Sequence, residues 1–164
     1  MTATPSPPAA TDAPAVTDDW LRLDQQICFS LNAAARAFNG VYRVVLKDLD
    51  ITYPQYLVML VLWEHGTLPV KALGERLRLD SGTLSPLLKR LETAGLVHRE
   101  RSARDERSVE VRLTEEGVAL RRRAVEVPRR ISAATGLRAE EMRSLSTTLA
   151  QLTAALDKAA AEGA

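Results

Sequence analysis

The most reactive side chain in this sequence belongs to its single cysteine, Cys28. A thiol attacks as the thiolate, and an unperturbed thiol of pKa about 8.5 is only a few per cent ionised at neutral pH. A lone cysteine excludes a disulfide within the chain. Most free cysteines are small buried hydrophobes, and Leu21, Leu31 and Ala35 lie at helical spacing around this one. From the residues alone, Cys28 is therefore either a packing residue or an oxidant-sensitive thiol.

Metal chemistry and enzymatic catalysis are not indicated. The two histidines, His65 and His98, do not give with Cys28 the ligand count of a zinc site. His65 lies beside Gly66 at an expected helix end, and His98 fits a strand surface. We expect no metal, no cofactor and no catalytic residue.

Hydroxyl and basic side chains form a second chemical group, within an expected helix over about residues 81–94. Its leucines fall on one helical face and would be buried. The other face carries Ser81, Thr83, Ser85, Pro86, Lys89 and Arg90. Hydroxyls and cations contact DNA phosphates and base edges. This pattern predicts DNA binding, with a merely solvated helix face as the alternative.

The hydrophobic periodicity predicts a mainly α-helical protein with a small β-hairpin. A first helix from Trp20 should break at Asn39-Gly40, before a short second helix over residues 41–49. Further helices are expected over residues 52–65, 70–77 and 81–94, from Thr114 to Gly136 with a kink at Pro128, and over 138–160. Strands are expected over 96–101 and 109–113.

Two helices followed by a hairpin predict a winged helix-turn-helix. Its second helix would enter the major groove, and the hairpin loop would reach the DNA backbone or the minor groove. About 13 residues of helix span roughly 20 Å, which is enough to cross that groove. Arg104 and Arg107 lie in the loop of the hairpin.

Charge and termini suggest a cytoplasmic protein without a membrane segment. The 164 residues carry a net charge of +1, but residues 65–164 hold 18 basic against 14 acidic side chains. Residues 1–17 are rich in Pro, Ala, Thr and Ser, so we expect a disordered tail rather than a secretory signal. The basic surplus in the later part permits a local basic face.

Several sequence runs resemble the MarR family of winged-helix regulators. They are ITYPQYL at 51–57, LWEH at 62–65, LDSGTLSPLLKRLE at 79–92 and RDERSV at 104–109. Asp105 and Arg107 mark the wing of that family. The run QICF at 26–29, ahead of Tyr42 and Tyr53, resembles its organic hydroperoxide sensor branch, the OhrR type.

This resemblance implies a homodimeric repressor on double-stranded DNA with an inverted-repeat operator, released when Cys28 is oxidised by an organic hydroperoxide. It also implies that the hydroxyls of Tyr42 and Tyr53 lie near the sulfur. Asn32 stands where a third tyrosine is frequent. The chain has no second cysteine, so it resembles the single-cysteine type, in which a low-molecular-weight thiol caps the oxidised residue.

The expected organisation is one domain over residues 18–160. Its DNA-binding lobe would cover about 51–113, and its dimerisation helices would cover 18–49 and 114–160. A row of apolar residues on the last helix needs a partner, which a second copy would supply: Met142, Leu145, Leu149, Leu152 and Leu156.

Two other functions remain open. In the first, the protein is a DNA-binding repressor released by a small aromatic or anionic ligand, with Cys28 passive. In the second, the protein is a thiol peroxidase, although turnover would need a resolving partner that the chain does not contain.

Overall fold

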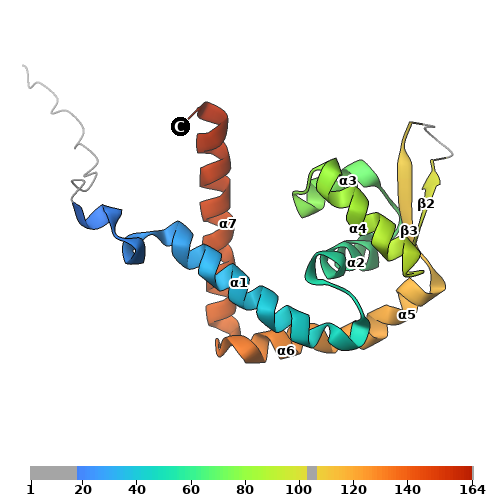
Figure 1. The fold of residues 1–164 in the computed structure, drawn as a ribbon, viewed down its shortest axis with the longest axis horizontal. Coiled ribbons are helices and arrows are strands. Elements are labelled where there is room, and N and C mark those ends of the chain that lie inside the picture. Colours follow the sequence, from blue (N-terminus) through green and yellow to red (C-terminus); the bar gives the residue numbers. More distant parts are fainter. Residues whose placement is uncertain (1–17, 103–106, 164) are drawn as a thin grey trace, which may run out of the picture. The chain divides into compact units, whose positions relative to one another are not determined.

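The computed structural model describes residues 18–102 and 107–163, and the predicted tail over 1–17 lies outside this range. The described chain is mainly helical with one small sheet (Figure 1). In chain order its elements are η1 (Asp18–Leu21), η2 (Leu23–Gln25), α1 (Ile27–Val45), η3 (Lys47–Leu49), α2 (Tyr53–His65), β1 (Leu68–Pro69), α3 (Val70–Leu77), α4 (Ser81–Thr93), β2 (Val97–Arg101), β3 (Val109–Leu113), α5 (Glu115–Ala124), α6 (Glu126–Thr135) and α7 (Ala139–Glu162).

The chain contacts divide it into two units, one up to Phe38 and one from Asn39 onward. The first unit contains η1, η2 and the first part of α1. Its large apolar side chains are exposed, including those of Leu21, Ile27 and Phe29. No helix among the described residues combines the length and the apolar composition needed to cross a bilayer.

The predicted break at Asn39-Gly40, with a separate helix over 41–49, is wrong. Helix α1 continues through both residues to Val45. A glycine inside a helix costs only about 1 kcal/mol relative to alanine, and such a cost does not by itself end a helix. The chain turns later, through η3, where Asp50 takes a left-handed conformation with φ of 53°.

Helices α2, α3 and α4 and the sheet form the winged-helix part of the second unit. Thr52 begins α2 as predicted, in a capping box in which its backbone N–H donates to Gln55 Oε1 at 2.8 Å. The predicted leucine face of α4 is confirmed for Leu84, Leu88 and Leu91, which are buried, whereas Leu87 on the same predicted face is only half-buried. Each buried leucine of this kind contributes roughly 1.5–3 kcal/mol.

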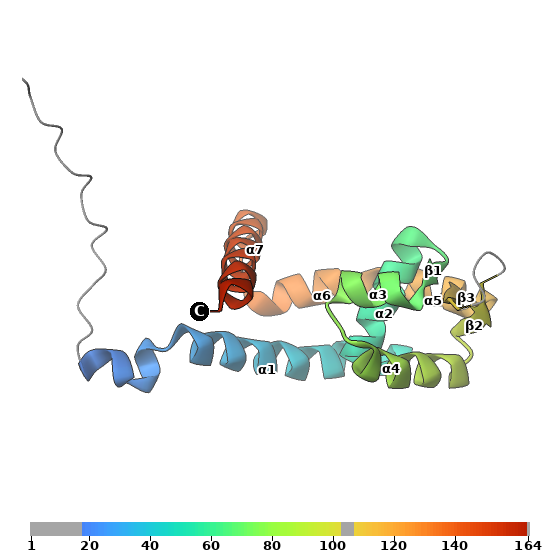
Figure 2. The ribbon, with the colours of Figure 1, turned by 90° about the horizontal axis from the view of Figure 1, so that it is seen from above.

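The sheet has the strand order β1-β3-β2, and both pairings are antiparallel. The predicted hairpin is confirmed, with Arg99 opposite Val111 and Val97 opposite Leu113. The two-residue strand β1, which the sequence analysis did not predict, pairs Leu68 with Val111. Figures 1 and 2 show the strands at one end of this part, beside the end of α4.

Gly117, in the first turn of α5, is the point where α2, the hairpin and α5 meet. The indole Nε1–H of Trp63 donates to the Gly117 carbonyl at 2.8 Å. A Cβ on Gly117 would lie only 2.1 Å from the carbonyl oxygen of Leu96. That same oxygen accepts the backbone N–H of Thr114 at 3.1 Å. Only glycine allows this approach of α5 to the chain that leads into β2.

The predicted kink near Pro128 is confirmed as a break between α5 and α6 at Val125. A proline ring clashes with the carbonyl four residues earlier, which here belongs to Ala124, the last residue of α5. Gly136 ends α6 in the left-handed conformation with φ of 68°. The last helix, α7, has no buried residue, and Leu145, Leu149 and Leu156 are exposed.

We predict that Gly117→Ala destabilises the protein, although alanine is the better helix former. The added methyl group would overlap the Leu96 carbonyl, and overpacking of this kind costs about 1–3 kcal/mol. The matched control is Gly40→Ala in α1, where an added Cβ meets no atom within 4 Å. That change should stabilise by about 0.5–1 kcal/mol. Urea unfolding measures both free energies, and an unchanged or raised stability of Gly117→Ala would contradict the packing described.

Candidate functional site

The outer face of α4 carries the polar side chains proposed to meet DNA. Ser81, Ser85, Pro86, Lys89 and Arg90 are all exposed. The buried leucines of the opposite face fix the helix in the lobe. The exposed groups therefore stand on a rigid element, as recognition requires.

Thr83 has a structural task in the same helix. Its backbone N–H donates to Asp80 Oδ1 at 2.9 Å, and its hydroxyl donates to Asp80 Oδ2 at 2.9 Å. These bonds lower the pKa of the Asp80 carboxyl, chiefly through the Thr83 backbone N–H. With its hydrogen used in this cap, the Thr83 hydroxyl faces any further partner as an acceptor.

The wing consists of β2, β3 and the segment that joins them. It carries Arg107, whose side chain is exposed. Arg104 and Asp105, which the sequence analysis placed in the same loop, lie outside the described residues. At the base of the wing, the buried Ser102 hydroxyl donates to Glu110 Oε1 at 2.8 Å. This bond joins the end of β2 to β3.

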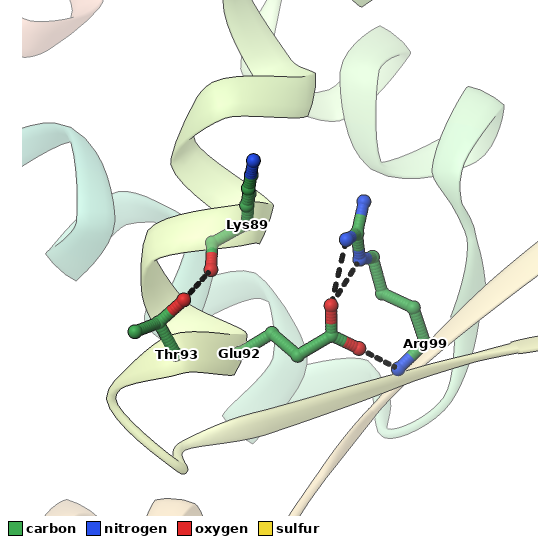
Figure 3. A network of polar contacts seen from close by, with 4 residues as sticks. All are labelled: Lys89, Glu92, Thr93 and Arg99. Carbon is green, nitrogen blue, oxygen red and sulfur yellow. Dashed lines mark hydrogen bonds and ion pairs between the residues drawn. The ribbon is translucent and has the colours of Figure 1, made fainter.

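An ion pair that the sequence analysis missed connects α4 to the wing (Figure 3). The Arg99 Nε–H and Nη2–H donate to Glu92 Oε2 at 2.9 and 2.6 Å. The backbone N–H of Arg99 donates to Glu92 Oε1 at 3.1 Å. The Arg99 hydrogen bond is the main reason that the pKa of Glu92 is lowered. The only signal in the sequence was opposite charges seven residues apart across Gly95.

The two predicted tyrosines lie together in the second unit. The ring centroids of Tyr42 and Tyr53 are 4.3 Å apart, and those of Tyr42 and Tyr56 are 6.0 Å apart. Burial raises the pKa of Tyr42 to about 12, with smaller contributions from Tyr53 and Tyr56. The Tyr42 hydroxyl therefore keeps its proton at neutral pH and can donate a hydrogen bond.

Cys28 is the second residue of α1 and lies in the first unit, where it is exposed. The interpretation of Cys28 as a buried packing residue does not hold within a single chain. Asn32, one helical turn later, is also exposed. Among the described residues, no group of three His, Cys, Asp or Glu side chains is arranged to hold a metal ion.

Comparison with known proteins points to one family. The family described as transcriptional regulator SarA/Rot matches residues 40–123. The organic hydroperoxide resistance transcriptional regulator of Bacillus subtilis is 48% identical over 131 residues, which cover 80% of this chain and 89% of the relative.

Two solved structures of AbfR, a protein of Staphylococcus epidermidis, share the fold. Reduced AbfR bound to DNA is 36% identical with a TM-score of 0.74, covering 86% of this chain and 96% of its own. Overoxidised AbfR bound to DNA is 37% identical with a TM-score of 0.70, covering 84% and 97%. Together with the lobe of α2 to β3, these similarities confirm the resemblance drawn from the sequence: the chain belongs to the MarR/SarA-type winged-helix transcriptional regulators.

Proposed function

We propose that this protein is a DNA-binding transcription repressor that senses organic hydroperoxides through Cys28 and then releases its operator. The observation that carries the proposal is an exposed thiol at residue 28 in a chain that is 48% identical, over 131 residues, to an organic hydroperoxide resistance regulator. The proposed partners are an inverted-repeat DNA duplex and a second copy of the chain. We place its action in the cytoplasm, where an isolated thiol stays reduced.

The DNA-binding part of the proposal is supported by the exposed face of α4 and by the wing. The face of α4 would read the major groove through Ser81, Ser85 and Lys89, and Arg107 would lie near the minor groove. The AbfR structures, which share the fold, contain DNA. We propose the same class of partner for this chain.

The chemical step uses the thiolate of Cys28 as the nucleophile and the hydroperoxide as the two-electron oxidant. The sulfur attacks the outer peroxide oxygen, the O–O bond breaks, and the products are a sulfenic acid and an alcohol. A low-molecular-weight thiol then displaces water from the sulfenic acid and forms a mixed disulfide. In the proposed dimer, the added bulk would have to be accommodated at a contact between helices, where overpacking costs about 1–3 kcal/mol.

Tyr42 and Tyr53 are proposed as hydrogen-bond donors to the peroxide oxygen on which negative charge develops. Cys28 and Tyr42 are both residues of α1, 14 positions apart. At 1.5 Å per residue, this is about 21 Å along the helix axis. We propose that the tyrosines that serve each Cys28 come from the second protomer of a dimer.

We predict that Cys28→Ser binds DNA like the wild type but is not released by oxidant. A suitable DNA duplex can be selected from a random pool with the reduced protein. One equivalent of cumene hydroperoxide should weaken wild-type binding at least tenfold in fluorescence anisotropy, and a mass spectrum should place the modification on Cys28. Release of Cys28→Ser by the same treatment would disprove the sensing mechanism and favour a ligand-operated repressor with a passive thiol.

Tyr42→Phe and Tyr53→Phe should slow the oxidation of Cys28 by about tenfold or more, without changing DNA affinity. The reason is the loss of a neutral donor to the developing charge. Tyr56→Phe is the matched control, because Tyr56 is 2% exposed and belongs to the core. Stopped-flow measurement of thiol loss gives the three rates, and equal rates in all variants would remove the tyrosines from the proposal.

The apolar row of α7 is proposed as a dimer seam. Leu149→Glu combined with Leu152→Glu should produce monomers, because carboxylates cannot be buried there unpaired, and operator binding should be lost with the dimer. Thr147→Glu, on the opposite face of the same helix, should leave the dimer intact. Analytical ultracentrifugation distinguishes the two results, and a dimeric double variant would place the interface elsewhere.

A further inference from the structure

A groove of about 430 Å³ separates α4 from the wing. Five polar residues line it: Lys71 comes from α3, Ser85 from α4 and Arg99 from β2, while Arg107 and Ser108 directly precede β3. Its described lining residues include no carboxylate. The remaining lining is apolar, with Val70, Leu88 and Val109. The groove therefore combines three cations and two hydroxyls with three apolar side chains.

The guanidinium of Arg99 is held in a fixed orientation at this groove. Two of its five N–H groups bind Glu92 Oε2, and the backbone N–H fixes the other carboxylate oxygen. Within the described residues, the other three guanidinium N–H groups have no acceptor, and Figure 3 shows one nitrogen turned away from Glu92. The Arg99 side chain is 31% exposed. One edge of the guanidinium is thus held by the protein, and the other edge is available to an anion.

The place of the groove indicates which anion it takes. When a recognition helix lies in the major groove and the wing reaches the adjacent minor groove, the element of DNA between them is one sugar-phosphate strand. A lysine ammonium and the outer edge of an arginine are donors suited to phosphate oxygens. Base edges, by contrast, lie in the grooves on either side of that strand.

We infer that the groove between α4 and the wing binds a backbone phosphate of the operator, through Lys71 and Arg99, with Glu92 as the residue that positions Arg99. The inference rests on the proposed DNA-binding function and adds a contact site to it. Glu92 touches no DNA and acts through the guanidinium that it holds.

The test is the salt dependence of DNA binding. Each phosphate contact contributes about 0.9 to the slope of log K against log salt concentration. Since a dimer has two such grooves, Lys71→Ala should make the slope less steep by about 1.8. It should weaken a selected and a scrambled duplex by the same factor, because phosphates carry no sequence. Lys158→Ala in α7, an exposed lysine paired with Glu162, is the matched control and should leave the slope unchanged.

Arg99 and Glu92 are tested as a double-mutant cycle, in which the double variant leaves no lone charge. Arg99→Gln with Glu92→Gln should also reduce the slope by about 1.8, whereas Glu92→Gln alone should lower affinity about three- to tenfold with the wild-type slope retained. In the Arg99→Gln background, Glu92→Gln should not lower the affinity further. Thermal melting followed by circular dichroism checks that each variant is folded.

Unchanged slopes for folded Lys71→Ala and for the Arg99 and Glu92 double variant would overturn the phosphate site while leaving DNA binding in place. An equal effect of Glu92→Gln with and without Arg99 would overturn the positioning role. A wild-type protein without measurable DNA affinity would overturn the proposed function and the phosphate site together.

Discussion

The close approach of Gly117 to the Leu96 carbonyl is the constraint on which the arrangement of the second unit depends. At this point α5 leaves the hairpin, and the Trp63 indole connects α2 to the same turn through the Gly117 carbonyl. The Thr114 hydroxyl donates to the Gly95 carbonyl at 2.6 Å and accepts the Gly117 N–H at 3.0 Å. The hairpin, α2 and α5 are therefore joined through one closely packed turn.

Local signals explain what could be predicted from the sequence. Thr52 with Pro54 marks the start of α2, the leucine spacing fixes the buried face of α4, and Pro128 ends α5 four residues earlier. Each of these features depends on neighbours within one or two helical turns. The family resemblance rests on similar short runs, and the comparisons confirm it.

Features that depend on distant partners could not be predicted in this way. Strand β1 has only two residues and exists because Val111 lies beside Leu68. Helix α1 passes through Asn39-Gly40 because nothing at that point favours a turn strongly enough to offset the helical hydrogen bonds. The hydrogen bond from Thr83 to Asp80 is a common helix cap. The sequence analysis treated Thr83 only as one of several exposed hydroxyls and did not predict this bond. The ion pair of Glu92 with Arg99 forms only when the hairpin packs against α4.

The two parts of the proposed function make opposite demands on the chain. The face of α4 that is proposed to contact DNA is preorganised, since α4 is capped by Asp80, packs on its buried leucines and is joined to β2 by the ion pair of Glu92 with Arg99. The thiol must instead meet an oxidant and then a second thiol, and Cys28 lies exposed in the first turn of α1. The tyrosines lie between these two extremes of exposure, because Tyr56 belongs to the core and Tyr42 is partly buried beside it.

Because of the exposed apolar row of α7, the activity of the proposed regulator would depend on its own concentration. A single chain leaves Leu145, Leu149 and Leu156 in water, so the proposed pairing of two chains would remove this surface from solvent and stabilise both. By mass action, the paired fraction then rises with the total amount of protein. Below the dissociation constant of the pair, the concentration of operator-competent species varies with the square of the protomer concentration. A twofold change in synthesis would there alter occupancy of a weak operator about fourfold, before any oxidant is present.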